Sequence, residues 1–122
     1  MLPKIKIPNG LKSSDLTHDK QIASVYDNDP LIHWKITFST FYHITKQGED
    51  SIQEAAKLKI PVLLMHGDSD NITSFAASEE FRANSGKSLS FVPWKGMFHE
   101  LHNEPVKEEV LKTAVDWLNG LE

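Results

Sequence analysis

One stretch of the sequence decides the fold: Ile60-Pro61-Val62-Leu63-Leu64-Met65-His66-Gly67. Its apolar run is nearly continuous, with Pro61 at the start and Gly67 just past the end. Such a run is typical of a parallel strand that is covered on both faces, since antiparallel strands usually alternate apolar and polar residues. A proline is tolerated at the first residue of a strand. We therefore predict a covered parallel strand over residues 60–65.

A helix and a second strand are predicted directly after this stretch. Residues 74–85 carry apolar side chains one helical turn apart and are followed by Gly86, a typical helix end. Residues 89–92 are mostly apolar and end at Pro93, which indicates another short strand. Together the three segments have the length of a strand-helix-strand unit with a right-handed crossover.

Helices are expected on both sides of this unit. Apolar residues recur at helical spacing from 106 to 118, between Pro105 and Gly120. Upstream, similar spacing predicts three helices, over residues 19–28, 33–46 and 52–58. Gly48 is expected to end the second helix, which is apolar enough to be buried or to face a partner. The first ten residues contain two prolines and a glycine, and we expect them to form an irregular arm.

The composition is that of an ordinary folded protein. The chain has 122 residues, of which 39% are hydrophobic and 25% charged. A net charge of -4 argues against nucleic acid as a partner. The absence of cysteine excludes disulfides, thiolate zinc sites and a cysteine nucleophile. No stretch has the roughly 18 apolar residues of a membrane span or the pattern of a signal peptide, so we expect a cytoplasmic protein without a membrane span.

Polar loops follow both predicted strands and hold the candidate chemistry. The loop at 66–74 contains Asp70, and the loop at 95–104 contains His99. Because functional loops leave the carboxyl ends of parallel strands at one edge of the sheet, these side chains should face each other. A carboxylate that accepts from imidazole Nδ1 fixes the tautomer and leaves Nε2 to move a proton. The residues alone leave a second interpretation open, in which Asp70 only stabilises a turn.

Residues 60–119 resemble the C-terminal part of the α/β-hydrolase fold, in the branch of monoacylglycerol lipases and lysophospholipases (serine aminopeptidase S33-like). The first motif that carries the resemblance is Pro61-Val62-Leu63-Leu64-Met65-His66-Gly67 followed by Asp70-Asn71-Ile72-Thr73. The second is Gly96-Met97-Phe98-His99-Glu100-Leu101-His102-Asn103-Glu104-Pro105. The resemblance implies that Asp70 is the catalytic acid and His99 the catalytic base. It also implies an acyl ester as the small-molecule substrate and no cofactor.

The resemblance extends upstream with less specific motifs. Residues 8–11 and 26–33 resemble the end of the helical cap that covers the acyl pocket in that branch. The expected fold class is α/β, a partial α/β-hydrolase fold in which a cap remnant precedes the last two parallel strands and their helices. Residues 1–48 would form the end of the cap with a linking helix, and residues 49–122 the C-terminal part of the core.

The nucleophile of such a hydrolase is missing from this sequence. It normally lies in Gly-x-Ser-x-Gly, ahead of the acid and the base. No serine here has a glycine two residues away on each side; Ser69 follows Gly67 but precedes Asn71. We therefore expect a C-terminal fragment of a serine ester hydrolase, inactive alone. The alternative is a non-catalytic interaction module, a homo-oligomer that hides the open edge of its sheet by dimerising.

The spacing of the other polar residues argues against a metal site. His99 and His102 are three residues apart, whereas the zinc motif His-Glu-x-x-His needs four. Ile72 occupies an oxygen-ligand position of a calcium loop, so no metal is expected. His66 is expected to pack beside the following glycine. Glu100 is expected either to support His99 or to be a surface acid. His102 is expected to lie in a loop or at the entry of a helix, and the remaining histidines to be structural or solvated. Trp94 and Phe98 are expected to pack or to border the pocket.

Overall fold

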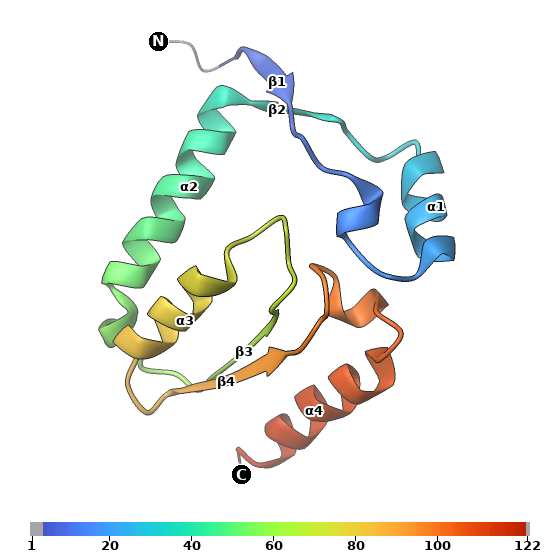
Figure 1. Ribbon diagram of the computed structural model, residues 1–122. Coiled ribbons are helices and arrows are strands. Elements are labelled where there is room, and N and C mark those ends of the chain that lie inside the picture. Colours follow the sequence, from blue (N-terminus) through green and yellow to red (C-terminus); the bar gives the residue numbers. More distant parts are fainter. Residues whose placement is uncertain (1–3, 122) are drawn as a thin grey trace.

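The computed structural model describes residues 4–121 and contains the predicted strand-helix-strand unit (Figure 1). β3 (Val62–Gly67) and β4 (Leu89–Trp94) pair in parallel, in register along their whole length. α3 (Phe75–Asn84) connects them and begins at Ser74, whose hydroxyl accepts the backbone N–H of Ala77. The α/β class expected from the apolar run is thereby confirmed.

The C-terminal helix lies on the side of the β3–β4 sheet that faces away from α3. α4 (Lys107–Asn119) follows the short helix η3 (Leu101–Asn103), and α3 and α4 lie on opposite sides of the β3–β4 pair (Figure 1). The Trp117 indole N–H donates to the Ser90 hydroxyl across 3.1 Å, which attaches α4 to β4. Within residues 4–121, every helix is too short or too polar to span a lipid bilayer.

The N-terminal segment of the chain has more regular structure than predicted. β1 (Lys6–Pro8) pairs antiparallel with β2 (Lys35–Thr37), so the predicted irregular arm contains a strand. The short helix η1 (Ser13–Asp15) and α1 (Lys20–Asn28) lie between these strands, and α1 matches the prediction for 19–28. Asp19 caps α1 by accepting two backbone N–H groups.

The boundaries predicted for the second helix were wrong. α2 (Phe38–Gln53) begins later than predicted because residues 35–37 are held by the pairing with β1. It also continues through Gly48, since one glycine costs a helix only about 1 kcal/mol. The helix predicted over 52–58 is reduced to the end of α2 and the short helix η2 (Ala55–Lys57).

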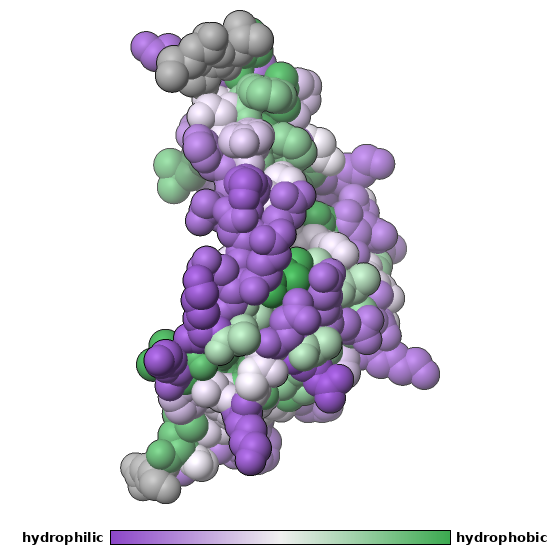
Figure 2. Space-filling model, turned by 90° about the vertical axis from the view of Figure 1, so that its left-hand side faces the viewer, coloured by the Kyte–Doolittle hydropathy of each residue, from purple (hydrophilic) through white to green (hydrophobic). Residues whose placement is uncertain are grey.

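α2 and the sheet are far less buried than the apolar pattern predicted. Phe38, Phe41 and Ile44 on α2 remain 51%, 52% and 63% exposed, and none of the side chains of β3 is fully buried. Hydrophilic residues cover much of the side of the molecule on which α2 lies, with hydrophobic patches between them (Figure 2). Within the described part of the chain, the residues that are buried as a whole are Leu16, Thr17, Ala55, Gly67, Leu101, Glu104 and Val110. Most of the burial therefore lies around the loop after β4 and not on the sheet.

Candidate active site

Asp70 and His99 meet at one edge of the sheet, in the loops that follow β3 and β4. His99 Nδ1 lies 2.8 Å from Asp70 Oδ2. The side chain of Asp70 is 1% exposed, whereas that of His99 is 35% exposed. The two loops thus bring a buried carboxylate against an accessible imidazole, as the order of strands and loops predicted. The catalytic roles of both residues stay a prediction.

The Asp70 carboxylate also shapes its own loop. Its Oδ1 accepts the backbone N–H groups of Ile72 at 2.7 Å and Thr73 at 3.0 Å. Its Oδ2 accepts the Thr73 hydroxyl at 2.7 Å. The turn-forming interpretation and the acid interpretation are therefore compatible, because one oxygen fixes the turn while the other faces the imidazole.

The environment of Asp70 favours its ionised form. Burial alone would raise the pKa of this carboxyl, but the hydrogen bonds from His99 and from Thr73 and Ile72 outweigh that effect. The net result is a pKa well below the usual value of 3.8. An ionised carboxylate only accepts hydrogen bonds, so each ring nitrogen that faces it carries a proton.

His66 is a third member of this cluster, which sequence reasoning missed. Its Nε2 lies 2.9 Å from Asp70 Oδ2 and its Nδ1 lies 2.7 Å from the hydroxyl of Ser78 on α3. The expectation that His66 only packs beside Gly67 was therefore wrong. A signal was present, because a histidine at the end of a strand lies four residues before an acid that turns back toward it.

His99 presents its second nitrogen outward. Because Nδ1–H donates to Asp70, a neutral His99 has an unprotonated Nε2. Within residues 4–121, no hydrogen-bond partner faces this Nε2, so it is available to a reacting hydroxyl. This tautomer is the one that a general base in a triad requires.

A close approach of the two loops requires glycine at position 67. A Cβ at Gly67 would lie 2.2 Å from the carbonyl oxygen of Met97 and 2.5 Å from that of Phe98. The backbone N–H of Gly96 donates to Asp68 Oδ1 across 2.6 Å, at a residue whose φ of 73° favours glycine. The two loops are therefore joined directly, which fixes the spacing between acid and base.

The other candidate residues do not join the acid and base. Glu100 accepts from the Asn103 side chain at 2.7 Å, and no contact with His99 is present in the described residues. His18 pairs with Glu104 at 2.9 Å, which is one of the two roles expected for it, a structural one. The Trp94 indole N–H is buried and has no partner within residues 4–121. The described residues also contain no metal-binding cluster of three or more His, Cys, Asp or Glu side chains.

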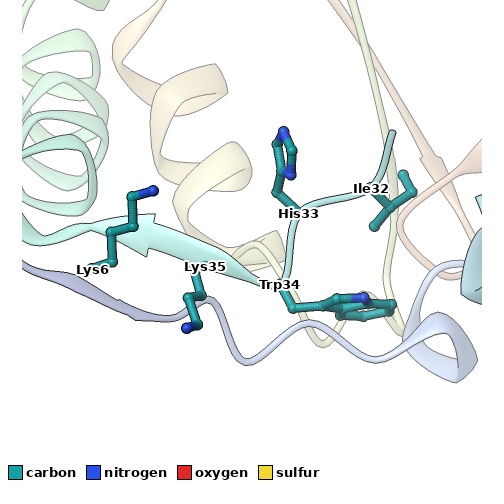
Figure 3. A pocket seen from close by; sticks show the side chains of 5 residues that line it. All are labelled: Lys6, Ile32, His33, Trp34 and Lys35. Atoms are coloured by element: carbon teal, nitrogen blue, oxygen red, sulfur yellow. The ribbon is translucent and has the colours of Figure 1, made fainter. Parts of the chain in front are cut away.

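A cavity of about 750 Å³ lies beside the Asp70 loop. Thr73 and His66 line it together with apolar residues from α2 and α3, such as Phe41 and Phe81. A second hollow of about 460 Å³ lies at β2, lined by Lys6, Ile32, His33, Trp34 and Lys35 (Figure 3). Its side chains do not converge, since Lys35 points away from Lys6 and His33 (Figure 3). The first cavity adjoins His66 and the Asp70 loop, and a further cavity of about 390 Å³ is lined by His99.

The chain is similar to known proteins over most of its length. Residues 1–106 match the family model described as Serine aminopeptidase, S33. An uncharacterised abhydrolase domain-containing protein of Dictyostelium discoideum is 30% identical over 120 residues, 97% of this chain and 13% of that protein. A monoacylglycerol lipase of Mycolicibacterium smegmatis is 29% identical over 122 residues, 97% of this chain and 42% of the lipase.

A solved structure matches the fold over nearly the whole chain. It is the monoacylglycerol lipase of Paleococcus ferrophilus, with a TM-score of 0.84 and 29% identity, covering 97% of this chain and 47% of that one. The chain thus spans less than half the length of each of these three proteins.

Proposed function

The chain belongs to the serine aminopeptidase S33 family and carries part of the α/β-hydrolase fold, and we propose that it supplies the acid and the base of a serine ester hydrolase. Asp70 is the acid and His99 the base. The observation that carries this proposal is the 2.8 Å contact between Asp70 Oδ2 and His99 Nδ1, which leaves Nε2 open to a substrate. The nucleophilic serine would come from a segment outside this sequence, since no serine here lies in Gly-x-Ser-x-Gly.

The proposed mechanism uses the imidazole twice. His99 Nε2 takes the proton of the serine hydroxyl while the serine oxygen attacks the acyl carbonyl. The Asp70 carboxylate stabilises the imidazolium that forms. The same proton then passes to the leaving alkoxide, which departs as an alcohol. His99 then takes a proton from water, which attacks the acyl-enzyme. The carboxylic acid leaves, and His99 returns the proton to the oxygen of the serine side chain. No cofactor takes part in this sequence of steps.

The proposed substrate is a monoacylglycerol, a lysophospholipid or a similar acyl ester. Two kinds of relatives support this class: monoacylglycerol lipases from two organisms and a phospholipase from Bacillus subtilis, 27% identical over 114 residues. We further propose a cytoplasmic location, to which the lack of cysteine is suited.

The open edge of β3 and the apolar cavity beside it are surfaces that another part of the sheet would cover. β3 pairs only with β4 among the described residues, and an uncovered edge strand is a pairing site. We propose that the segment with the nucleophile packs on this side. On that proposal the chain alone is inactive.

A fluorophosphonate probe tests the inactivity of the purified chain. We expect neither serine labelling nor hydrolysis of monooleoylglycerol above the level of the His99→Ala variant. Stoichiometric labelling of a serine in this chain, lost in His99→Ala, would overturn the proposal that the nucleophile lies elsewhere.

The second candidate function is a non-catalytic module that dimerises. The observation in its favour is the number of large apolar side chains left exposed, including Ile44 at 63% on α2 and Leu118 at 57% on α4. Light scattering during size-exclusion chromatography tests it. A dimer that resists dilution to low micromolar concentration supports the module, whereas a folded monomer at high concentration contradicts it.

A further inference from the structure

The carboxylate of Glu104 is the most deeply buried polar group in the described part of the chain, and neither Asp70 nor His99 touches it. Its side chain has no exposed surface. The backbone N–H of Phe98 donates to Oε1 at 2.7 Å, and the backbone N–H of His18 donates to Oε2 at 3.2 Å. His18 Nδ1 lies 2.9 Å from the same Oε2. One carboxylate thus joins two segments that are 86 residues apart in sequence.

Further contacts join the same two segments, residues 16–18 and residues 98–104, which we call the Glu104 junction. The Thr17 hydroxyl donates to the carbonyl oxygen of Asn103 at 2.7 Å. The His18 ring stacks on Phe98 with centroids 3.8 Å apart. Leu16 and Thr17 are only 4% and 3% exposed. The junction is therefore better packed than the sheet itself.

The junction holds the backbone on both sides of His99. Phe98, the residue before it, donates its N–H to Glu104. Glu100, the residue after it, donates its N–H to the carbonyl oxygen of Leu16 across 2.8 Å. In the described residues, the backbone of His99 itself makes no hydrogen bond to another backbone group. Its position therefore depends on its neighbours, through these two flanking hydrogen bonds and the bond from Gly96 to Asp68.

We infer that Glu104 is a positioning residue, which acts with residues 16–18 to hold His99 in reach of Asp70. The inference rests on the proposed function, because that function is what makes the position of His99 important. The contacts of the junction themselves are independent of it. A buried carboxylate that loses its donors is costly, so the bonded arrangement is strongly preferred over an open loop. Thr17 also accepts the backbone N–H of Asp19 at 3.0 Å, and Asp19 caps α1. The junction therefore connects the start of α1 to the base.

The test compares Glu104→Gln with two controls in ¹⁵N-labelled protein. Glutamine keeps one carbonyl oxygen for Phe98 but places an NH₂ group opposite the donors of His18. Glu108→Gln makes the same change of charge at an exposed site. Ala55→Gly destabilises a buried position in η2, outside the junction.

In Glu104→Gln we expect the His99 ring to lose its single Nδ1–H tautomer. We also expect the amide exchange of Phe98 to accelerate about tenfold or more, because the junction that protects this N–H loses a hydrogen bond from His18. Ala55→Gly should lower the melting temperature without changing the ring signals, and Glu108→Gln should change neither. Wild-type ring signals together with wild-type exchange in Glu104→Gln would overturn the inference.

A milder variant keeps the test decisive if Glu104→Gln does not fold. Thr17→Val removes one hydroxyl of the junction at nearly constant volume, and we expect the same changes at smaller amplitude. Unchanged ring signals and exchange in Thr17→Val would then count against the inference. A wild-type chain without the Nδ1–H tautomer contradicts the proposed function instead, and Phe98 exchange still decides the role of Glu104.

Discussion

His66 and His99 donate to the same oxygen, Oδ2 of Asp70, from 2.9 Å and 2.8 Å. They use opposite ring nitrogens, since His66 donates through Nε2 and His99 through Nδ1. The other ring nitrogen of His66, Nδ1, contacts the Ser78 hydroxyl, and the His66 side chain is 11% exposed. The His99 side chain is 35% exposed. One imidazole therefore fixes the carboxylate within the protein and the other faces outward, where a proton can be exchanged.

The opposite tautomers of the two histidines can be measured directly. At pH 8, we expect long-range ¹⁵N correlation spectra to show protonated Nε2 on His66 and protonated Nδ1 on His99, because an ionised carboxylate only accepts. Ser78→Ala should release the ring of His66 and leave the tautomer of His99 intact. The same tautomer on both rings would contradict the arrangement.

Gly67→Ala should destabilise the protein by about 1–3 kcal/mol, the usual cost of overpacking. A Cβ there would lie 2.2 Å from the carbonyl oxygen of Met97, so the two loops would have to separate. Gly48→Ala is the matched control, because nothing lies within 4 Å of a Cβ at this helical position. It should be neutral or stabilising by up to about 1 kcal/mol. Equal urea midpoints for the two variants would contradict the close approach.

Asp70→Asn should lower stability most at neutral pH. Because the pKa of Asp70 is lower in the folded state, its contribution is fully present above the usual value of 3.8 and is lost as the pH falls toward the folded value. We expect a deficit on the order of 2 kcal/mol at pH 7 that shrinks below about pH 4. Asp116→Asn, at an exposed pair with Lys112, is the control and should change little at either pH. A deficit that does not vary with pH would contradict this.

The strand-helix-strand unit could be predicted from sequence because its signals are local. The apolar run before Gly67 and the polar loop after each strand are patterns of a few consecutive residues. Their order alone places Asp70 and His99 at one edge of the sheet. Covered faces were predicted for β3 as well; α3 and α4 lie on the two sides of the sheet, but the side chains of β3 stay only partly buried, and in the described chain no further strand pairs with it.

The remaining features depend on contacts between distant segments. β1 and β2 are three residues each, and their partners are 27 to 31 residues apart in sequence, which no local pattern indicates. Glu104 looks like a surface acid in the sequence, but the backbone N–H groups of Phe98 and His18 converge on it in the fold. The spacing of His66 to Asp70 is a local signal, but nothing near His66 in the sequence indicates its second contact, with the Ser78 hydroxyl on α3.

The most direct test of the central claim transfers this chain into a related lipase. The matching part of the Paleococcus ferrophilus monoacylglycerol lipase, 47% of that protein, would be replaced by residues 1–122. Monoacylglycerol hydrolysis by this chimera would then be measured beside its Asp70→Asn and His99→Ala variants, with circular dichroism to confirm equal folding. If Asp70 and His99 are the acid and base, the chimera hydrolyses the ester and each variant loses about 10³-fold or more of kcat. Equal rates in the folded chimera and its His99→Ala variant would contradict the claim.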